Sequence, residues 1–506
     1  MPPEANDCSL LHHILALQAG LRPDAPALWW QDTPISFAEL HRRVSQLSHA
    51  LAGIGTAGDR IGLLSWNCPE FIELMYAVPA AGRVLVPLNA RLAPAEWADQ
   101  LQRTDCQWLF GDAALLQRLR DADCSAAAVR MIPLDSNYHD WLQTAQQCTP
   151  APVDPEDIAW ILFTSGSTGK PKGAMLSHRG FMAGLRSAAH ARPVAPGDRF
   201  YYPFPLFHVA AHNVLLQHRY GACVVLPRGF DAAETIDACH RLGVTSMSLA
   251  PTMLAMLLDH PDFSPAVLSS VRSIGYGASA MPVSLLQRLL TTTDVGLCQS
   301  YGMTELCGSV AFLTAQDHQL ALQKSALLQS VGHVLPTARV RLVDDNGADC
   351  PPGVTGEITV QAAQQFSGYW GDEAASAQAL RHGWLHTGDI GRFDSAGYLY
   401  IVDRKKDMII SGGENVASRE VEEVLRTHPA VRDCAVIGLP DTRWGEAVAA
   451  VIVAQAATDN ASLEKHCRAR LGAYKTPRHW FQASALPLNA AGKVDKPLLR
   501  QRYATQ

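Results

Sequence analysis

A run rich in glycine, hydroxyl and lysine side chains, Thr164–Gly173 (TSGSTGKPKG), follows a short apolar segment. Glycines let the backbone come close to a polyphosphate, hydroxyl and amide groups donate hydrogen bonds to it, and lysines supply positive charge. The run is not a Walker A loop, because Gly166 and Gly169 are too close together and Pro171 follows the first lysine. A flexible surface turn would rarely combine two lysines with four hydroxyls. We therefore predict a phosphate-binding loop.

Three later motifs carry groups suited to nucleotide chemistry. Gln299–Glu305 (QSYGMTE) offers an aromatic ring that can stack on a purine and a carboxylate that can hold Mg²⁺ beside phosphates. His386–Asp389 (HTGD) ends in a carboxylate that can accept both hydroxyls of a ribose. Pro487–Lys493 (PLNAAGK) ends in a lysine that can stabilise charge developing on phosphate. Each motif alone would be read as a turn or a surface charge, so the functional reading depends on their occurring together.

In this order, the four motifs resemble the signatures of the adenylate-forming superfamily, which includes acyl-CoA synthetases, firefly luciferases and peptide-synthetase adenylation domains. The resemblance extends over nearly the whole chain, from Asn67–Glu70 (NCPE) to Lys493. It implies an ATP-dependent acid–thiol ligase. Such an enzyme joins a carboxylic acid to AMP, releases pyrophosphate, and passes the acyl group to a thiol, here that of coenzyme A.

The resemblance implies roles for the residues around ATP. Tyr301 would stack on adenine, Thr304 would bond the α-phosphate region, and Glu305 would hold Mg²⁺ together with Thr164. The residues implied to contact the triphosphate are Thr164, Ser165, Gly166, Ser167, Thr168, Gly169, Lys170 and Lys172. The residues implied to line the adenine pocket beside Tyr301 are Gly277, Ala278, Ser279, Ser300 and Gly302.

The late motifs are implied to complete the site and to change it between half-reactions. Asp389 would bind the ribose hydroxyls, and Arg404 would add a contact to ribose or phosphate. Lys493 would stabilise the transition state of adenylate formation. Because the thiol must then approach where this lysine stood, the C-terminal domain of the family rotates, about a residue that is Lys406 in this sequence.

Coenzyme A is implied to contact the C-terminal part of the chain. The glycines of the turn Ser411–Asn415, Gly412 and Gly413, would leave room for the thin pantetheine arm. Trp444 and Tyr474 resemble positions at which a relative, chlorobenzoate-CoA ligase, packs the nucleotide of coenzyme A.

The acyl site is implied near His208, in the segment PLFH. His208 would orient the carboxylate or line the pocket, and a core histidine is the alternative. Phe207–Val209 offers no anion for an amino group, which disfavours an amino acid, and Ser300 replaces the arginine of malonate-activating relatives. Val209 and other small or apolar residues would form the walls. We predict a hydrophobic monocarboxylic acid, with fatty, alicyclic and aromatic acids and their chain lengths left open.

Other functions remain open at this point. A ligase that loads a carrier protein or a freestanding adenylation domain would use the same first half-reaction, although no phosphopantetheine attachment motif follows Lys493. A luciferase-like oxygenase has no specific support. A non-catalytic nucleotide sensor would not need Lys493, Glu305 and the phosphate loop together.

These motifs need an α/β scaffold to position them. Short apolar runs bounded by glycine, proline and serine are typical of buried parallel strands, and they occur at Arg60–Ser65, Ile158–Phe163, Cys223–Leu226 and Ser246–Leu249. Helical patterns at Ala232–Leu242 and Val283–Leu290 lie between or after them. Alternation of this kind predicts layered α/β sheets.

After about Val331 the pattern becomes short alternating runs with glycine and proline, which predicts a small β subdomain. Beyond Asp403 mixed α and β patterns return, with an amphipathic helix at Arg419–Thr427. We therefore expect a large N-terminal domain over residues 1–402 and a small, mobile α+β C-terminal domain over residues 403–506.

Bulk composition restricts the remaining choices. The 506 residues, 48% of them hydrophobic and 18% charged, suit a globular enzyme of two or more domains. The net charge of -6 and the lack of long basic runs argue against nucleic acid and anionic membranes as partners. The twelve cysteines are scattered and predict reduced thiols. With no secretory signal or membrane span recognised, we expect a cytoplasmic enzyme; its oligomeric state is left open, a homodimer included.

Overall fold

The computed structural model describes residues 8–122, 129–164, 170–277, 281–412, 414–489 and 492–504. The chain divides into two compact units. The N-terminal unit comprises Met1–Arg339 and Val360–Leu385, and the C-terminal unit comprises Val340–Thr359 and His386–Gln506. The predicted division at residues 402 and 403 falls within a strand, β20 (Leu399–Arg404), and stays a prediction.

The first sheet of the N-terminal unit has six strands in the order β6-β5-β3-β4-β7-β8. The neighbours are parallel except for the antiparallel pair β7 and β8. That hairpin carries both ends of the predicted phosphate loop. The strands are β3 (Arg60–Leu64), β4 (Val84–Pro87), β5 (Trp108–Gly111), β6 (Arg130–Pro133), β7 (Ile158–Thr164) and β8 (Lys172–Ser177).

The second sheet of this unit runs in the order β15-β14-β13-β12-β11-β9-β10-β1-β2. Strands β9 to β13 are parallel to their neighbours along this path, and β14 turns back antiparallel to β13. The strands are β1 (Pro26–Trp30), β2 (Thr33–Ser36), β9 (Arg199–Tyr201), β10 (Cys223–Leu226), β11 (Ser246–Ser248), β12 (Ser273–Gly277), β13 (Gly296–Met303), β14 (Gly308–Leu313) and β15 (Ser330–Val334).

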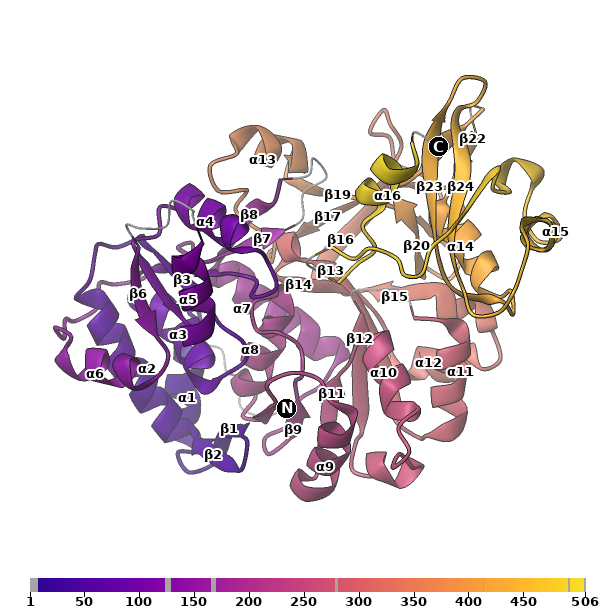
Figure 1. Ribbon diagram of the computed structural model, residues 1–506. Coiled ribbons are helices and arrows are strands. Elements are labelled where there is room, and N and C mark those ends of the chain that lie inside the picture. Colours follow the sequence, from indigo (N-terminus) through magenta and orange to yellow (C-terminus); the bar gives the residue numbers. More distant parts are fainter. Residues whose placement is uncertain are drawn as a thin grey trace. The chain divides into compact units, whose positions relative to one another are not determined.

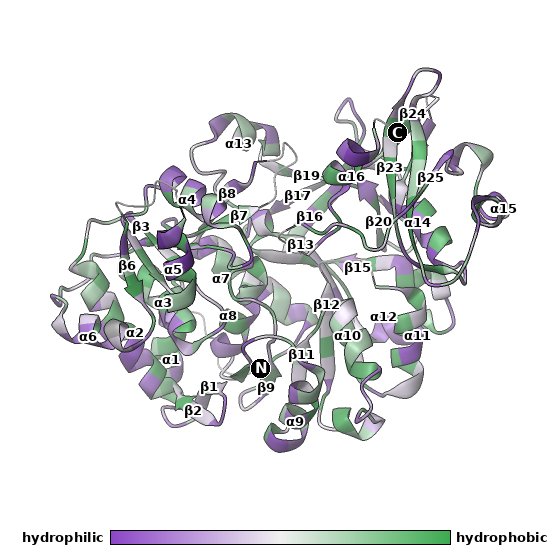
Figure 2. Ribbon diagram, in the orientation of Figure 1, coloured by the Kyte–Doolittle hydropathy of each residue, from purple (hydrophilic) through white to green (hydrophobic). Residues whose placement is uncertain are grey.

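Helices cover these sheets (Figure 1). Among them, α2, α5, α7 and α9 each begin at a side chain that caps the first turn. In α9, Asp231 accepts a hydrogen bond from the Glu234 N–H, and the helix ends at Gly243 with φ 56°, a left-handed conformation that favours glycine. Figure 2 shows α9 with one hydrophobic and one hydrophilic side, as expected for a helix packed on a sheet. The longer helices are α2 (Phe37–Ala52), α3 (Pro69–Ala80), α4 (Pro94–Arg103), α7 (His178–Ala191), α9 (Ala232–Leu242) and α11 (Val283–Thr292). The shorter ones are α1 (His13–Leu21), α5 (Ala113–Asp121), α6 (Ser136–Thr144), α8 (His212–Arg219), α10 (Pro251–Leu258), α12 (Ala315–Ala321) and α13 (Glu373–Ala379), with 3₁₀ turns η1 (Val209–Ala211), η2 (Pro265–Leu268), η3 (Thr304–Leu306) and η4 (Ser325–Gln329).

The C-terminal unit contains a β part and an α/β part. Strands β16 (Ala338–Val343), β17 (Gly356–Ala362), β19 (Trp384–Phe393) and β20 lie in that order. The two-residue β18 (Leu380–Arg381) pairs with the first two residues of β19, within the segment Val360–Leu385 of the N-terminal unit. A five-stranded sheet follows in the order β22-β21-β24-β23, with β25 beside β24. Its strands are β21 (Ile409–Ser411), β22 (Glu414–Val416), β23 (Val431–Asp441), β24 (Gly445–Ala454) and β25 (His479–Gln482).

Both faces of the long hairpin β23–β24 are buried, because helices cover each of them. Alternate residues of a strand point to opposite faces. One set, including Val436 and Ile452, packs with α14 (Ser418–Arg426) and α15 (Asn460–Arg468). The other set, including Ile437 and Val451, packs with α16 (Lys496–Tyr503). One 3₁₀ turn, η5 (Ala473–Lys475), precedes β25.

The predicted fold class is confirmed, since layered α/β sheets, a β part after Val331 and a smaller α/β part all occur. Within the described residues every cysteine is a free thiol. None of the helices that the structure describes is long and apolar enough to cross a membrane.

Candidate active site

Glu305 is the centre of the predicted ATP site in the N-terminal unit. It follows β13 in the short turn η3, and only 5% of its surface is exposed. The hydroxyl of Thr164, at the end of β7, donates to Glu305 Oε1 at 3.4 Å. The hydroxyl of Tyr369 donates to the same oxygen at 2.9 Å. The structure therefore brings together the two residues predicted to hold Mg²⁺.

Backbone geometry fixes this carboxylate. A Cβ at Gly302 would lie 2.0 Å from the carbonyl oxygen of Gly308, so only glycine fits between β13 and β14. Cys307 then adopts φ 46° and Gly308 φ 136°, which turn the chain sharply back. The Phe366 N–H donates to the Glu305 carbonyl oxygen at 2.9 Å. The glycine of the motif is thus required by strand packing as well as by chemistry.

Glu305 forms no ion pair with any residue in the described part of the chain. Its neighbours are the two neutral hydroxyls of Thr164 and Tyr369. No group of three or more histidine, cysteine, aspartate or glutamate residues that could hold a metal occurs among the described residues. One carboxylate with a hydroxyl beside it fits Mg²⁺, which takes few protein ligands and completes its shell with phosphate oxygens and water.

The phosphate loop connects the paired ends of β7 and β8, where Thr164 lies opposite Lys172. The ammonium of Lys172 lies over the ring of Tyr369, 5.3 Å from its centroid. Lys170 is exposed. The remaining predicted members of the loop, Ser165, Gly166, Ser167, Thr168 and Gly169, lie outside the described residues.

Tyr369 was missed by the sequence analysis. It contacts both Glu305 and Lys172, and burial raises the pKa of its hydroxyl further above the physiological range, with the nearby Glu305 carboxylate adding to the effect. The neutral phenol therefore acts as a hydrogen-bond donor. The only signal in the sequence is an aromatic cluster at residues 366–370, which by itself suggests packing.

The predicted adenine segment lies on adjacent strands β12 and β13. Gly277 is paired with Ser300, and a Cβ at Gly277 would lie 2.8 Å from the Ser300 carbonyl oxygen. Tyr301 follows on β13 and is half-buried, and Thr304 opens η3. The predicted Ala278 and Ser279 lie outside the described residues.

His208 lies at the start of η1, on the segment that leads into α8. Its ring meets that of Phe207 edge-on at 4.8 Å, and Phe207 in turn lies 6.1 Å from the ring of Trp66. His208 is half-buried, whereas Phe207 is buried. This aromatic cluster suits the wall of an apolar site, and the role of His208 stays a prediction.

In the C-terminal unit, the two residues predicted at the ribose lie together. Asp389 and Arg404 are register partners on β19 and β20, and Arg404 Nε lies 2.7 Å from Asp389 Oδ1. Asp389 is 3% exposed. The arginine thus holds the carboxylate in place on β19.

The predicted hinge, Lys406, is exposed in a turn between β20 and β21. Arg500 of α16 donates to Asp407 Oδ1 at 2.9 Å and to the Lys406 carbonyl oxygen at 3.5 Å. On the N-terminal side of Lys406, the ammonium Nζ of Lys405 lies 3.2 Å from Glu357 Oε2. The hinge turn is therefore held on both sides by ion pairs.

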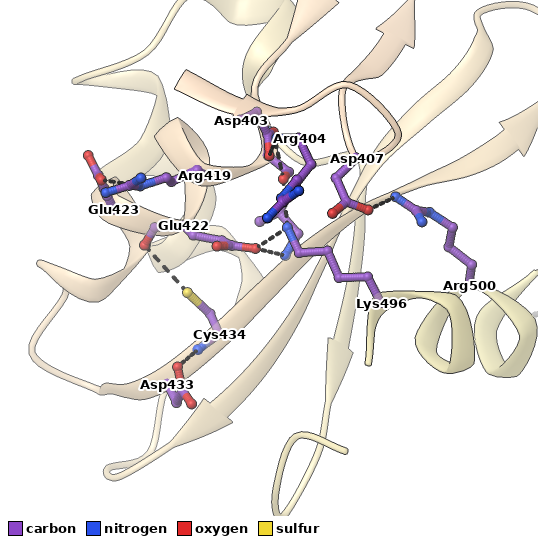
Figure 3. Close-up of polar contacts among 12 residues, drawn as sticks. Asp403, Arg404, Asp407, Arg419, Glu422, Glu423, Asp433, Cys434, Lys496 and Arg500 are labelled. Atoms are coloured by element: carbon purple, nitrogen blue, oxygen red, sulfur yellow. Dashed lines mark hydrogen bonds and ion pairs between the residues drawn. The ribbon is translucent and has the colours of Figure 1, made fainter. Parts of the chain in front are cut away.

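A buried polar network joins this turn to the helices of the unit (Figure 3). Asp403 Oδ2 accepts from the Ser418 N–H at 2.5 Å and from the Ser418 hydroxyl at 2.8 Å. Lys496 Nζ donates to the Ser418 hydroxyl at 2.6 Å and pairs with Glu422 Oε1 at 2.8 Å. We call Asp403, Ser418, Glu422 and Lys496 the hinge network.

The predicted catalytic lysine, Lys493, stands on a short hairpin just before α16. The Asn489 N–H donates to the Lys493 carbonyl oxygen at 2.7 Å, and the Lys493 N–H donates to Asn489 Oδ1 at 3.1 Å. Gly492 has φ 74°, which the turn requires. Lys493 is exposed, while Lys496, three residues later, belongs to the hinge network.

Two of the predicted coenzyme A residues contact each other. Gly412 has φ 64° and its N–H donates to the Trp444 carbonyl oxygen at 2.8 Å, while a Cβ at Gly412 would lie 2.8 Å from the Trp444 ring. Arg478 lies over that ring at 4.3 Å. Tyr474 is 39% exposed, and Gly413 lies outside the described residues. An exposed tyrosine and an arginine over an indole suit a nucleotide with phosphates.

Comparison with known proteins agrees with this geometry. The family model of AMP-binding enzymes matches residues 15–370, and that of the AMP-binding enzyme C-terminal domain matches residues 420–493. A feruloyl-CoA synthase of Amycolatopsis sp. is 36% identical over 499 residues, 96% of this chain and 97% of the relative. The fatty acid–[acyl-carrier-protein] ligase ScoC of Streptomyces coeruleorubidus is 32% identical over 495 residues, 95% of this chain and 94% of the relative.

A solved relative is o-succinylbenzoate CoA synthetase of Bacillus subtilis. In complex with its acyl-adenylate intermediate it superposes with a TM-score of 0.87 at 30% identity, covering 96% of this chain and 97% of that one. Its complex with ATP and magnesium gives a TM-score of 0.86, covering 96% and 98%. With the family models matched over most of the chain, the protein belongs to the AMP-binding enzymes of the adenylate-forming superfamily and is an ATP-dependent acid–thiol ligase, as predicted.

Proposed function

We propose that this enzyme is an acyl-CoA synthetase for a hydrophobic monocarboxylic acid. The observation that carries the proposal is the contact of Thr164 and Tyr369 with the Glu305 carboxylate. Thr164 is the residue at which the predicted phosphate loop, with its two lysines, begins. The aromatic wall of Trp66 and Phe207 beside His208 supports an apolar acid. Similarity to a feruloyl-CoA synthase, whose product carries an aromatic acyl group, supports the same class of acid.

In the first half-reaction a carboxylate oxygen attacks the α-phosphorus of ATP, and pyrophosphate leaves. Magnesium, when bound, would neutralise phosphate charge. Glu305 and Thr164 would hold it, and Lys170 and Lys172 would add positive charge near the leaving pyrophosphate. Lys493 would stabilise the negative charge that builds up on the attacking and phosphate oxygens. Asp389 would hold the ribose so that the α-phosphorus stays in line.

In the second half-reaction the thiol of coenzyme A attacks the acyl carbon, and AMP leaves. The C-terminal unit would reorient about Lys406 between the two steps, bringing the turn at Gly412 and the Trp444 ring to the acceptor side. The same proposal includes a division of the chain near residue 402, a cytoplasmic location, and either a monomer or a homodimer.

The acceptor thiol has one alternative. The relative ScoC is a fatty acid–[acyl-carrier-protein] ligase, so the same first half-reaction here could serve a protein-bound thiol. The positions of Trp444, Arg478 and Tyr474 favour coenzyme A, because a ring–guanidinium stack and a second exposed ring suit the adenine nucleotide at the end of coenzyme A.

The test is AMP release with ATP and Mg²⁺ over a panel of fatty, alicyclic, aromatic and amino acids, with and without coenzyme A. We expect AMP release and an acyl-CoA product with hydrophobic acids only when coenzyme A is present. Pyrophosphate exchange without an acyl-CoA product would instead assign the acceptor to a carrier protein. ATP binding with no turnover of any acid would overturn the enzyme assignment.

A further inference from the structure

Arg192 carries a charge inside the N-terminal unit that the mechanism above does not use. It follows the last turn of α7 and its side chain runs in between α8 and the strands β11 and β12. Its Nη1 donates to the Ser248 hydroxyl at 3.0 Å and, more weakly, to Asn213 Oδ1 at 3.5 Å, and its Nη2 donates to the Met247 carbonyl oxygen at 3.3 Å. All three acceptors are neutral.

Within the described residues no carboxylate forms an ion pair with Arg192. The guanidinium also lies over the ring of Phe200 at 5.7 Å, and Cys298 and His212 are near enough to interact with it. Burial lowers the pKa of Arg192, the direction expected when a cation loses water without gaining an anion. A cation left in this way is costly unless another group compensates it.

The position of the guanidinium relates it to the predicted acyl site. A Cβ at Gly275 would lie 2.4 Å from Arg192 Nη1, so the guanidinium lies directly against the backbone of Gly275. Gly275 is paired with Ser248 and stands two residues before Gly277, whose partner is Ser300. On one strand, residues two apart lie on the same face, about 7 Å from each other.

The contact of Arg192 with Asn213 connects the guanidinium to the segment that contains His208. Asn213, which accepts from Arg192, donates through its own Nδ2 to the Ala210 carbonyl oxygen at 2.9 Å. Ala210 belongs to η1, directly after His208. Arg192 thus contacts the strand that ends at Gly277 in the predicted adenine segment and, through Asn213, is linked to the turn η1 that follows His208 at the predicted acyl site.

From this placement we propose that Arg192 is a specificity-determining residue that donates a hydrogen bond to an oxygen of the acyl group remote from the reacting carboxyl. The enzyme then prefers acids with an apolar body and a distal hydroxyl, phenol or carboxylate oxygen to wholly apolar acids of the same length. The inference rests on the proposed acyl-CoA synthetase function and extends its substrate class, because an acid with a distal carboxylate is no longer a monocarboxylic acid.

The alternative is that Arg192 only ties α7 to β11 through the Met247 carbonyl oxygen and the Ser248 hydroxyl. In that case its removal would lower the stability of the fold, or the turnover of every acid alike. A specific role predicts a change in the ratio between two acids that differ in one oxygen, and that ratio does not depend on the amount of folded enzyme.

The experiment measures kcat/KM for acyl-CoA formation with matched acids: cinnamic, 4-hydroxycinnamic and 4-carboxycinnamic acid, and octanoic, 8-hydroxyoctanoic and octanedioic acid. We expect the wild type to prefer an oxygen-bearing member of at least one series by about tenfold or more, because a site built to hydrogen-bond an oxygen discriminates against the analogue that lacks it. A stronger effect of the carboxylate than of the hydroxyl would identify the oxygen as anionic.

Arg192→Met should remove that preference while the plain acid is still used, and Arg192→Lys should keep part of it. Arg186→Met is the matched control, because Arg186 lies on the same helix α7 and is exposed. A wild-type enzyme that uses these acids without preference for the oxygen overturns the inference, whatever the variants do, and so does an Arg192→Met enzyme that keeps the preference. No AMP release with any acid would overturn the proposed function itself.

Discussion

The Glu305 site and the hinge network handle buried charge in opposite ways. Glu305 is 5% exposed, and the contacts that the structure describes for it are the neutral hydroxyls of Thr164 and Tyr369. In the hinge network, Lys496 and Glu422, whose side chains are 14% and 10% exposed, pair at 2.8 Å. Arg192 resembles Glu305 in this respect, because its acceptors are neutral.

The difference indicates where a ligand is expected to supply the missing charge. A buried charge with only neutral neighbours is poorly compensated until an ion of opposite sign arrives, so it suits a binding site. Charges that compensate each other hold elements together. In the C-terminal unit such pairs surround the turn at Lys406, where a hinge needs firm anchors on either side of a few mobile bonds.

The largest effect is expected for Lys493→Ala. The rate of adenylate formation, measured by pyrophosphate exchange, should fall by roughly 10³-fold, because a positive group is lost where the transition state gains negative charge. Thiolation of a supplied acyl-adenylate should be nearly unchanged. Equal losses in both half-reactions would contradict the two-state use of the C-terminal unit.

Glu305→Gln should lower adenylate formation by roughly 10²-fold and raise the Mg²⁺ concentration needed for half-maximal rate, because the neutral amide no longer attracts the cation. Its thermal stability should not fall, since no ion pair of the described residues is lost. Tyr369→Phe is the matched control: it keeps the ring beside Lys172 and removes one hydrogen bond to Glu305, so we expect a smaller loss. An unaltered Mg²⁺ requirement in Glu305→Gln would refute the metal role.

Lys496→Met should act on stability rather than on metal or nucleotide binding. It breaks the 2.8 Å ion pair of Glu422, which keeps only the longer pair with Arg426 at 3.7 Å, and it removes the cation near the buried Asp403, so we expect a loss of about 3 kcal/mol in the free energy of unfolding. Urea unfolding of the full chain measures it. The double variant Lys496→Met/Glu422→Leu should recover part of the loss, because the buried charge of Glu422 is removed together with its closest partner. A double variant as unstable as the single one would show that the pair itself is not the cause.

Acid should destabilise the N-terminal unit through its buried histidines. His218, bonded to the Tyr76 hydroxyl and the Ala27 carbonyl oxygen, has its pKa lowered by burial to about 4. Because this folded-state pKa is below the unfolded value of about 6.5, the neutral ring contributes stability that is complete above pH 6.5 and is lost as the pH falls toward 4.

His218→Phe should therefore reduce the slope of unfolding free energy against pH between 6.5 and 4, by a total on the order of 3 kcal/mol across that range. Tyr76→Phe is the control, since it removes the hydroxyl partner but keeps the titrating ring. His212, whose pKa is also lowered to about 4 chiefly by burial, would leave a residual slope in either variant. An identical slope in wild type and His218→Phe would exclude His218 as a source of acid sensitivity.

The strands and helices near the motifs could be predicted well because their signals are local. The strand at Cys223–Leu226 and the helix at Ala232–Leu242 have the predicted bounds, and the strand predicted at Ser246–Leu249 ends one residue earlier. Apolar runs and capping residues act over a few positions, so the sequence reports them directly. The family and the enzyme class could be predicted for the same reason, since short motifs carry them.

The contacts across the fold could not be predicted in this way. Tyr369 meets Glu305 although 64 residues separate them, and Arg192 meets Gly275 and Ser248 from a helix end that carries no motif. The pairing of Lys496 with Glu422 could not be predicted either, although Lys496 is only three residues after the predicted catalytic Lys493.

The amino-acid sequence by itself thus determined the family and the enzyme class. It also predicted the chemistry of the site: a phosphate loop, a carboxylate for a metal, an acceptor for ribose and a late lysine, in the order of one superfamily. Only the tertiary structure decided which charges are compensated within the protein and which are left for a ligand. That distinction depends on the burial of a group and on neighbours brought in from distant segments, and the free energy of a buried charge is set by those neighbours rather than by its own type.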